Sequence, residues 1–284
     1  MASVDGRPIG VFDSGLGGLT VVRALIDLLP DEHLVYFGDT GRFPYGPKPR
    51  EEVLKYAFEI TELLMGHDVK LVVVGCNSAA AAALADLRAR YEVPLTGVIE
   101  PGLRAAAKAT RSGRIGVIGT VGTIASGAYQ RAAEAICPGV ELTCAACPGF
   151  VEFVEAGDVD SDQVFVLAER LLAPVRAAGV DTLVLGCTHY PLLARTIGDV
   201  MGPGPDGDRV VLVSSGEETA FEVAAVLDAV GARRRPGPGG PGISPGDAAA
   251  RRLFLTSGDP ATFRALGSRF LGPEVDTVEA WRWS

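Results

Sequence analysis

The feature that most constrains the fold is the alternation of short apolar runs with longer stretches rich in alanine and leucine. This pattern predicts strands and helices that follow one another in parallel α/β sheets, with ligand-binding groups at the carboxyl ends of the strands. We expect strands at residues 9–12, 33–37, 71–74, 95–99, 115–118, 183–185, 210–213 and 253–255. We expect helices at residues 51–65, 79–89, 127–136, 162–177 and 217–229.

The two halves of the chain carry related motifs in the same order. Residues 7–15 match residues 113–120, and residues 71–78 match residues 183–189, with Cys76 opposite Cys187. The offsets are 115 − 9 = 106 and 187 − 76 = 111 residues. Parallel strands resemble one another in composition, but apolar-Gly-Cys-polar-polar is a narrower pattern than a generic strand end. We therefore expect two similar parallel-sheet α/β domains that face each other with pseudo-two-fold symmetry, and an active site in the cleft between them.

The order of the motifs also suggests domain boundaries. We expect the first domain to be discontinuous, built from residues 1–97 and 210–284, and the second domain to comprise residues 98–209. Residues 231–252 are rich in Gly and Pro and offer little that can pack, which predicts a surface loop or a disordered excursion.

Composition narrows the class of function. The net charge of −9 leaves no overall electrostatic attraction for nucleic acid or for an anionic membrane, and no apolar run is long enough to span a bilayer. The first residues lack the basic and apolar segments of a signal peptide, and five cysteines do not suggest a disulfide framework. We expect a cytoplasmic protein with free thiols that binds neither nucleic acid nor membrane.

Cys76 and Cys187 are the strongest candidates for chemistry. Each follows an apolar strand and a glycine and precedes a helical segment, so the helix dipole and backbone N–H groups are expected to lower the pKa of each thiol. A single free cysteine is usually a small buried apolar residue. Two cysteines at equivalent positions in two repeated halves of the chain instead suggest a pair of thiols that flank one cleft. That arrangement suits racemisation at carbon, in which a base takes a proton from one face and an acid returns one to the other.

Two other patterns point elsewhere but are incomplete. The glycines at positions 15, 17 and 18 follow a strand, yet Thr20 stands where a dinucleotide fingerprint needs its last glycine. Asp39 follows the second strand and either serves the site or caps a turn. Cys144 and Cys147 have metal-site spacing without a second pair, so we interpret them, together with Cys137, as packing residues. We expect no metal and no nucleotide cofactor.

Several motifs resemble those of the aspartate/glutamate racemase family, and most closely the glutamate racemases. The similar segments lie at residues 10–18, 44–46, 74–78, 147–155 and 185–191, and the likeness extends in order to residues 256–271. Ser78 stands where the family usually has Thr, and the hydroxyl is retained. The resemblance implies a cofactor-independent interconversion of L- and D-glutamate that supplies the D-isomer for peptidoglycan, carried out by a homodimer without pyridoxal phosphate.

The resemblance also implies roles for single residues. Cys76 and Cys187 match the paired acid and base, Asp13 and His189 match groups that assist them, and Glu155 matches a carboxylate that orients His189. The positions that match substrate-binding residues are Asp13, Ser14, Tyr45, Gly46, Asn77, Ser78, Thr188 and His189. Thr120 follows the expected strand at 115–118, and we expect it to add a hydroxyl to the cleft.

Two alternatives stay open at this point. Two-thiol chemistry does not fix the length of the substrate side chain, so the substrate could be aspartate or a related acid. The same scaffold could also belong to a binding or regulatory protein without turnover.

Overall fold

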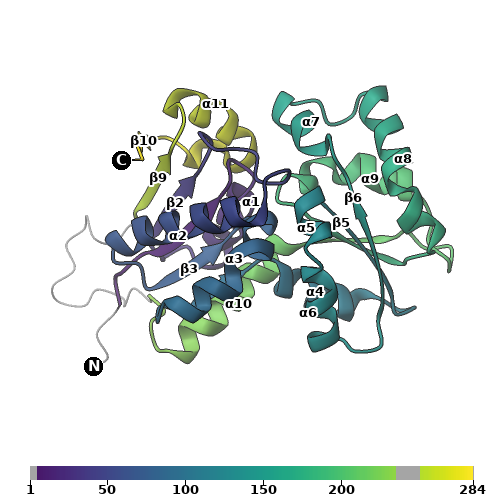
Figure 1. The fold of residues 1–284 in the computed structure, drawn as a ribbon, viewed down its shortest axis with the longest axis horizontal. Coiled ribbons are helices and arrows are strands. Elements are labelled where there is room, and N and C mark those ends of the chain that lie inside the picture. Colours follow the sequence, from purple (N-terminus) through teal and green to yellow (C-terminus); the bar gives the residue numbers. More distant parts are fainter. Residues whose placement is uncertain (1–4, 235–249, 284) are drawn as a thin grey trace.

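The computed structural model describes residues 5–234 and 250–283, and in it the chain forms two parallel sheets flanked by helices (Figure 1). The first sheet contains the first and last strands of the described chain and has the strand order β10-β9-β2-β1-β3-β4. Its strands are β1 (Ile9–Asp13), β2 (Leu34–Gly38), β3 (Leu71–Val74), β4 (Leu95–Gly97), β9 (Arg252–Thr256) and β10 (Val278–Ala280). Its helices are α1 (Leu19–Leu28), α2 (Arg50–Gly66), α3 (Asn77–Arg90), α10 (Ser215–Ala229) and α11 (Pro260–Leu271), with a short 3-10 turn, η2 (Gly272–Glu274).

The second sheet has the order β6-β5-β7-β8. Its strands are β5 (Arg114–Gly119), β6 (Glu141–Ala146), β7 (Thr182–Gly186) and β8 (Val211–Ser214). The helices in this part of the chain are α4 (Ile99–Ala109), α5 (Val121–Ala125), α6 (Ala128–Ile136), α7 (Phe150–Ala156), α8 (Asp162–Ala177), η1 (Tyr190–Leu193) and α9 (Ala194–Met201).

The internal repeat is visible in the topology. In each sheet the first four strands in sequence order lie side by side as second, first, third, fourth: β2-β1-β3-β4 and β6-β5-β7-β8. The central strands β1 and β5 pair with β3 and β7, so residues that follow β3 and β7 emerge at equivalent sheet edges. Every residue of β1, β3 and β7 is buried, as expected for strands covered on both faces. The expected fold class, two similar parallel-sheet α/β domains, is confirmed.

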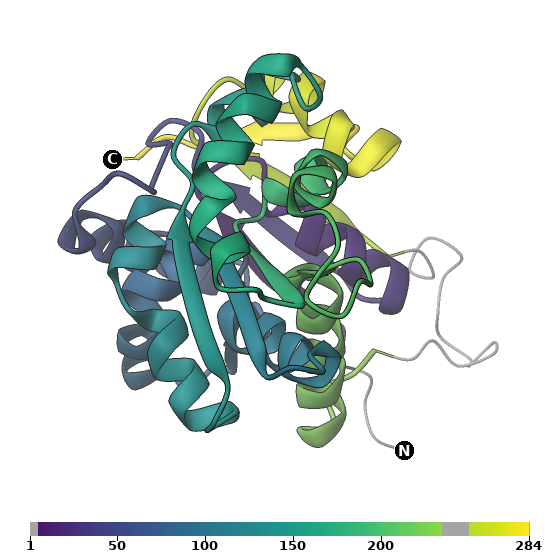
Figure 2. The same ribbon diagram turned by 90° about the vertical axis from the view of Figure 1, so that its right-hand side faces the viewer.

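The two domains share part of their apolar core. Successive residues of a strand point to opposite faces. On β5, Val117 packs into the larger core, which extends from the first sheet, whereas Ile118 packs into a smaller core on the far side of the second sheet. Helix α10 packs against both α1 and α4, which ties the crossing segments together. Figure 2 shows the second domain lying across the first.

The structure corrects several expected boundaries. Strand β8 pairs with β7 in the second sheet, so we propose that the chain returns to the first domain after Ser214 rather than at residue 210. The expected strand at 95–99 ends at Gly97, and Ile99 begins α4. Strands β6 and β10 were not expected, because the first is a mostly half-exposed edge strand and the second is short and exposed. The expected loop at 231–252 lies largely outside the described residues.

Candidate active site

A pocket of about 110 Å³ lies between the carboxyl ends of the two sheets. Cys76 lines it from the first domain and Cys187 from the second, and both side chains are more than nine-tenths buried. The other expected residues in its lining are Ser14, Tyr45, Gly46, Asn77, Ser78, Thr120, Thr188 and His189. Asp13 and Glu155 lie behind this lining and contact residues that belong to it.

Cys76 is the residue before α3, as the sequence suggested. Its sulfur lies 3.7 Å from Ser14 Oγ. Burial and the nearby carboxylate of Asp13 raise the pKa of Cys76 to about 12, although backbone N–H groups of Ala79 and Ser14 act in the opposite direction. The expectation that the helix N-terminus lowers this pKa is therefore wrong, because desolvation and a negative neighbour outweigh the backbone groups.

Asp13 ends β1 and is fully buried beneath the pocket. It accepts hydrogen bonds from the backbone N–H of Gly15 at 2.8 Å and from Thr188 Oγ1, in the second domain, at 3.2 Å. Burial raises the pKa of Asp13, and the positive charge that His189 can carry partly offsets this effect. Asp13 thus links the two sides of the site electrostatically.

Cys187 has a different neighbourhood. His189 Nδ1 lies 3.9 Å from Cys187 Sγ, and His189 Nε2 lies 3.1 Å from Glu155 Oε1. Burial lowers the pKa of His189, but its hydrogen bonds to Cys187 and Glu155 outweigh burial and raise it to about 10. The imidazole can therefore carry a proton beside the Cys187 thiol at neutral pH.

The position of the His189 ring is fixed by aromatic side chains from the first domain. The rings of Phe43 and Phe270 have centroids 6.1 Å and 5.8 Å from it. Gly17 also approaches this ring closely, since a Cβ at Gly17 would lie 2.3 Å from Thr188 Oγ1 and 2.5 Å from His189 Nδ1. The glycine loop after β1 thus lets the second domain approach without a side chain between them.

Hydroxyl and backbone groups join the domains around the pocket. Ser78 Oγ lies 2.9 Å from Thr120 Oγ1, and the Gly122 N–H donates to the Gly46 carbonyl at 2.9 Å. Asn77 Nδ2 donates to the hydroxyl of Tyr129, in the second domain, at 2.9 Å. These contacts join the two sides of the pocket, and Ser78 and Thr120 belong to its lining, where hydroxyl groups can bind carboxylates.

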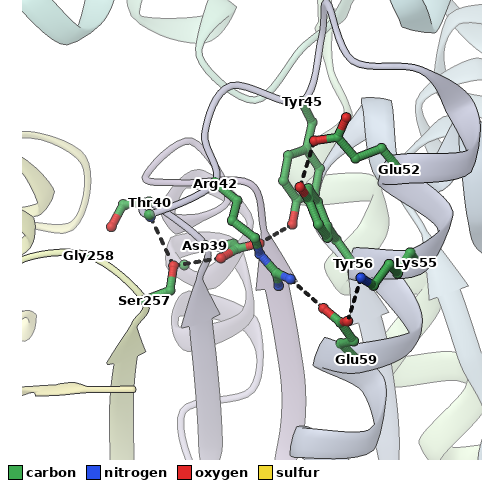
Figure 3. A network of polar contacts seen from close by, with 12 residues as sticks. Asp39, Thr40, Arg42, Tyr45, Glu52, Lys55, Tyr56, Glu59, Ser257 and Gly258 are labelled. Carbon is green, nitrogen blue, oxygen red and sulfur yellow. Dashed lines mark hydrogen bonds and ion pairs between the residues drawn. The ribbon is translucent and has the colours of Figure 1, made fainter. Parts of the chain in front are cut away.

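Tyr45 is placed differently from a simple substrate ligand. Tyr45 is one of the residues that line the pocket, and its hydroxyl donates to Asp39, as Figure 3 shows. Burial and the Asp39 carboxylate raise the pKa of Tyr45, so the hydroxyl remains a donor. Asp39, which the sequence left undecided, therefore acts on the pocket through Tyr45.

Sequence reasoning missed part of the lining. Cys147, interpreted as a packing residue, lines the pocket, and so do Phe43, Val121 and Glu152. Burial raises the pKa of Cys147 to about 12. The one signal for Cys147 was its position directly after β6, a strand that the sequence analysis did not predict.

Within residues 5–234 and 250–283, no group of three or more His, Cys, Asp or Glu side chains is arranged to hold a metal ion. Among the helices of the same ranges, none is long and apolar enough to cross a membrane.

Comparison with known proteins gives consistent matches. The family model for Asp/Glu/hydantoin racemases matches residues 9–219. A glutamate racemase from a Parafrankia species is 53% identical over 275 residues, which cover 97% of this chain and 94% of that one.

Solved structures agree with the sequence matches. A glutamate racemase isoform from Bacillus anthracis superposes with a TM-score of 0.88 at 38% identity, covering 99% of this chain and 98% of that one. A glutamate racemase from Francisella tularensis, solved in complex with D-glutamate, superposes with a TM-score of 0.85 at 29% identity and the same coverage.

Proposed function

The chain belongs to the Asp/Glu/hydantoin racemase family and, within it, to the glutamate racemases, and we propose that it interconverts L- and D-glutamate by passing the α-proton between Cys76 and Cys187. As a member of this family it is an isomerase. One observation carries the proposed mechanism: the two thiols stand at matching positions of a duplicated fold and line one pocket from opposite domains.

In the proposed reaction one cysteine, as thiolate, removes the α-proton, and the other, as thiol, protonates the opposite face of the carbanion. The two sulfurs exchange protonation states in each turnover, so the same pair serves both directions. His189 assists Cys187 by exchanging a proton with it, and Glu155 holds the imidazole in place. Ser14 and Asp13 act on the Cys76 side. Following the resemblance of the motifs, we assign abstraction from D-glutamate to Cys76 and abstraction from L-glutamate to Cys187.

The polar lining suits an amino acid with two carboxylates. Of the Ser78 and Thr120 hydroxyls, which lie 2.9 Å apart, the one that accepts from the other can donate to a carboxylate oxygen, and His189 can add positive charge. The α-proton of an amino acid is weakly acidic, so neutralising the α-carboxylate lowers the cost of the carbanion. The choice of glutamate over aspartate rests on the Parafrankia and Bacillus anthracis relatives, which are both named glutamate racemases.

Chirality-resolved product analysis tests this proposal. Purified protein, dialysed against chelator and without added pyridoxal phosphate, is incubated separately with each enantiomer of glutamate and of aspartate. We expect both glutamate enantiomers to reach a racemic mixture, with a higher kcat/KM than for aspartate. Preference for aspartate, or activity that returns only with a metal or pyridoxal phosphate, would contradict the proposal.

We also propose a setting for the reaction. A racemase of this family would act in the cytoplasm as a homodimer and supply D-glutamate for peptidoglycan. Light scattering coupled to size-exclusion chromatography gives the oligomeric state, for which we expect twice the 29.5 kDa of one chain. A depletion strain that grows normally without exogenous D-glutamate would argue against the cell-wall role.

A further inference from the structure

A cluster outside the reacting groups connects the C-terminal segment to the wall of the pocket. Its centre is Arg42, whose side chain is only 16% exposed. The guanidinium carbon lies 3.9 Å from the ring centroids of both Tyr56, on α2, and Trp283, which follows β10. A guanidinium stacked between two aromatic faces is held in one plane and orientation.

The edge of the same guanidinium holds two carboxylates. Arg42 Nε donates to Asp39 Oδ2 at 2.7 Å, and Arg42 Nη1 forms an ion pair with Glu59 (Figure 3). Asp39 is fully buried, and it also accepts from the hydroxyls of Tyr45 and Ser257. A buried carboxylate is stable only while its partners stay in place, so Arg42 fixes Asp39 and, through it, Tyr45.

The C-terminal strands fix the same loop from a second side. Thr40 Oγ1 lies 2.7 Å from Thr256 Oγ1, and the Gly41 N–H donates to Ser257 Oγ at 2.9 Å. The loop then runs on to Tyr45 and Gly46, which line the pocket and meet Gly122 of the second domain. Residues at the far end of the chain thereby set the position of a loop near residue 45.

We infer that Arg42 and Trp283 are positioning residues, which hold the loop at residues 43–47 so that Tyr45 and Gly46 form a fixed wall for the bound substrate. Neither residue lines the pocket. Their removal should therefore loosen substrate binding more than it slows proton transfer. The inference rests on the proposed function for the identity of the substrate, but the ordering of the loop can be measured without any substrate.

The chain offers a matched control. Trp281 is 38% exposed, and its ring centroid lies 6.3 Å from that of Trp283, yet the contacts of Arg42 with aromatic rings are to Tyr56 and Trp283. The link from this segment to Thr256 is made by the backbone N–H of Trp281, which an alanine retains. Trp281→Ala thus removes an indole from the same segment without removing the stack.

The experiment combines kinetics with hydrogen–deuterium exchange. In Trp283→Ala we expect KM for both glutamate enantiomers to rise roughly tenfold, with kcat changed much less, and Trp283→Phe to restore most of the loss because it keeps an aromatic face. Backbone amides at residues 40–47 should exchange faster in substrate-free Trp283→Ala, and at the wild-type rate in Trp281→Ala. Arg42→Lys keeps the charge but loses the planar stack, and it should reproduce both effects if Trp283→Ala proves too unstable to measure.

Unchanged KM and unchanged exchange in Trp283→Ala or Arg42→Lys would overturn the inference, as would equal effects from Trp281→Ala. A wild-type protein that leaves glutamate unchanged would count against the proposed function instead. In that case the exchange rates of residues 40–47 still decide whether the stack orders the loop.

Discussion

The thiols that follow β3 and β7 occupy equivalent positions in the two sheets, yet their neighbours carry opposite charge. Cys76 lies near the Asp13 carboxylate and Ser14, and its pKa is raised to about 12. Cys187 lies 3.9 Å from His189, whose own pKa is raised to about 10 by Cys187 and Glu155 despite burial. The duplicated backbone is symmetric, whereas the electrostatics of the site are not.

This difference indicates how the site is poised before substrate binds. A buried thiol beside a carboxylate keeps its proton, so under the proposed mechanism Cys76 begins as the acid, and on the Cys187 side it is His189 that carries a proton at neutral pH. Because the two enantiomers have equal free energy in solution, kcat/KM must be the same in both directions at every pH. The asymmetry can therefore affect only kcat and KM taken separately.

Removal of either thiol should have the largest effect. Cys76→Ala or Cys187→Ala deletes the proton carrier on one face, and we expect racemisation to fall by at least the roughly 10²–10⁴-fold associated with a lost base. Circular dichroism at a glutamate-sensitive wavelength follows the reaction. Cys137→Ala, at a half-buried cysteine outside the pocket lining, should retain wild-type activity. Near-normal racemisation in either variant would show that the replaced cysteine is not a proton carrier and serves only in packing.

The next largest effect should come from Gly17, where the first domain approaches His189. A methyl group at this position would lie 2.3 Å from Thr188 Oγ1 and 2.5 Å from His189 Nδ1, so the side chains of Thr188 and His189 must move. A displacement of this kind can cost about 100-fold in rate, and we expect Gly17→Ala to lose about that much kcat. Gly198→Ala, whose added methyl group has its nearest neighbour at 3.7 Å, should have little effect.

A smaller effect should follow from Glu155→Gln, which keeps the hydrogen bond to His189 but removes the charge. The pKa of His189 should fall. If activity needs a protonated His189, the loss of activity on the alkaline side of the pH–rate profile should begin at a lower pH in the variant than in the wild type. Each unit of that fall corresponds to roughly a tenfold change in the protonation equilibrium. A pH–rate profile measures the shift. Glu134→Gln, on the exposed face of α6, serves as the control. Identical pH–rate profiles for Glu155→Gln and wild type would show that the charge of Glu155 has no role in the reaction.

The smallest effect concerns stability. Because the folded state raises the pKa of His189 from 6.5 to about 10, the stabilisation from its bound proton is complete below pH 6.5 and is lost as the pH rises towards 10. Cys76 also has a raised pKa, from 9.0 to about 12, so its contribution is lost only above about pH 9. Urea unfolding from pH 6 to 10 should show a decline in the free energy of unfolding that His189→Asn flattens between pH 6.5 and 9. Cys76→Ala should leave that interval unchanged.

The sequence was sufficient to predict what local patterns determine. Buried parallel strands have continuous apolar sequences, and residues at their carboxyl ends converge by topology, so Cys76 and Cys187 were predicted to flank one cleft, while the resemblance of its motif placed Asp13 beside them. Contacts between segments that are far apart in the sequence could not be predicted from the sequence alone. Trp283 meets Arg42, 241 positions earlier in the chain (283 − 42 = 241), only because β9 adds to the edge of the sheet beside β2. Cys147 is buried in the smaller core, as expected for a packing residue, but its place in the pocket lining was not predicted, because the preceding strand β6 is half-exposed and lacks an apolar pattern.

The central claim, that the two thiols act on opposite faces of one carbon, can be tested by isotope exchange in the single cysteine variants. Each variant is incubated in heavy water with one enantiomer at a time, and deuterium at the α-carbon is followed by NMR. Cys187→Ala retains Cys76 and should exchange slowly into D-glutamate and hardly at all into L-glutamate, and Cys76→Ala should show the reverse preference. Exchange of both enantiomers at equal rates in either variant would contradict the two-sided arrangement.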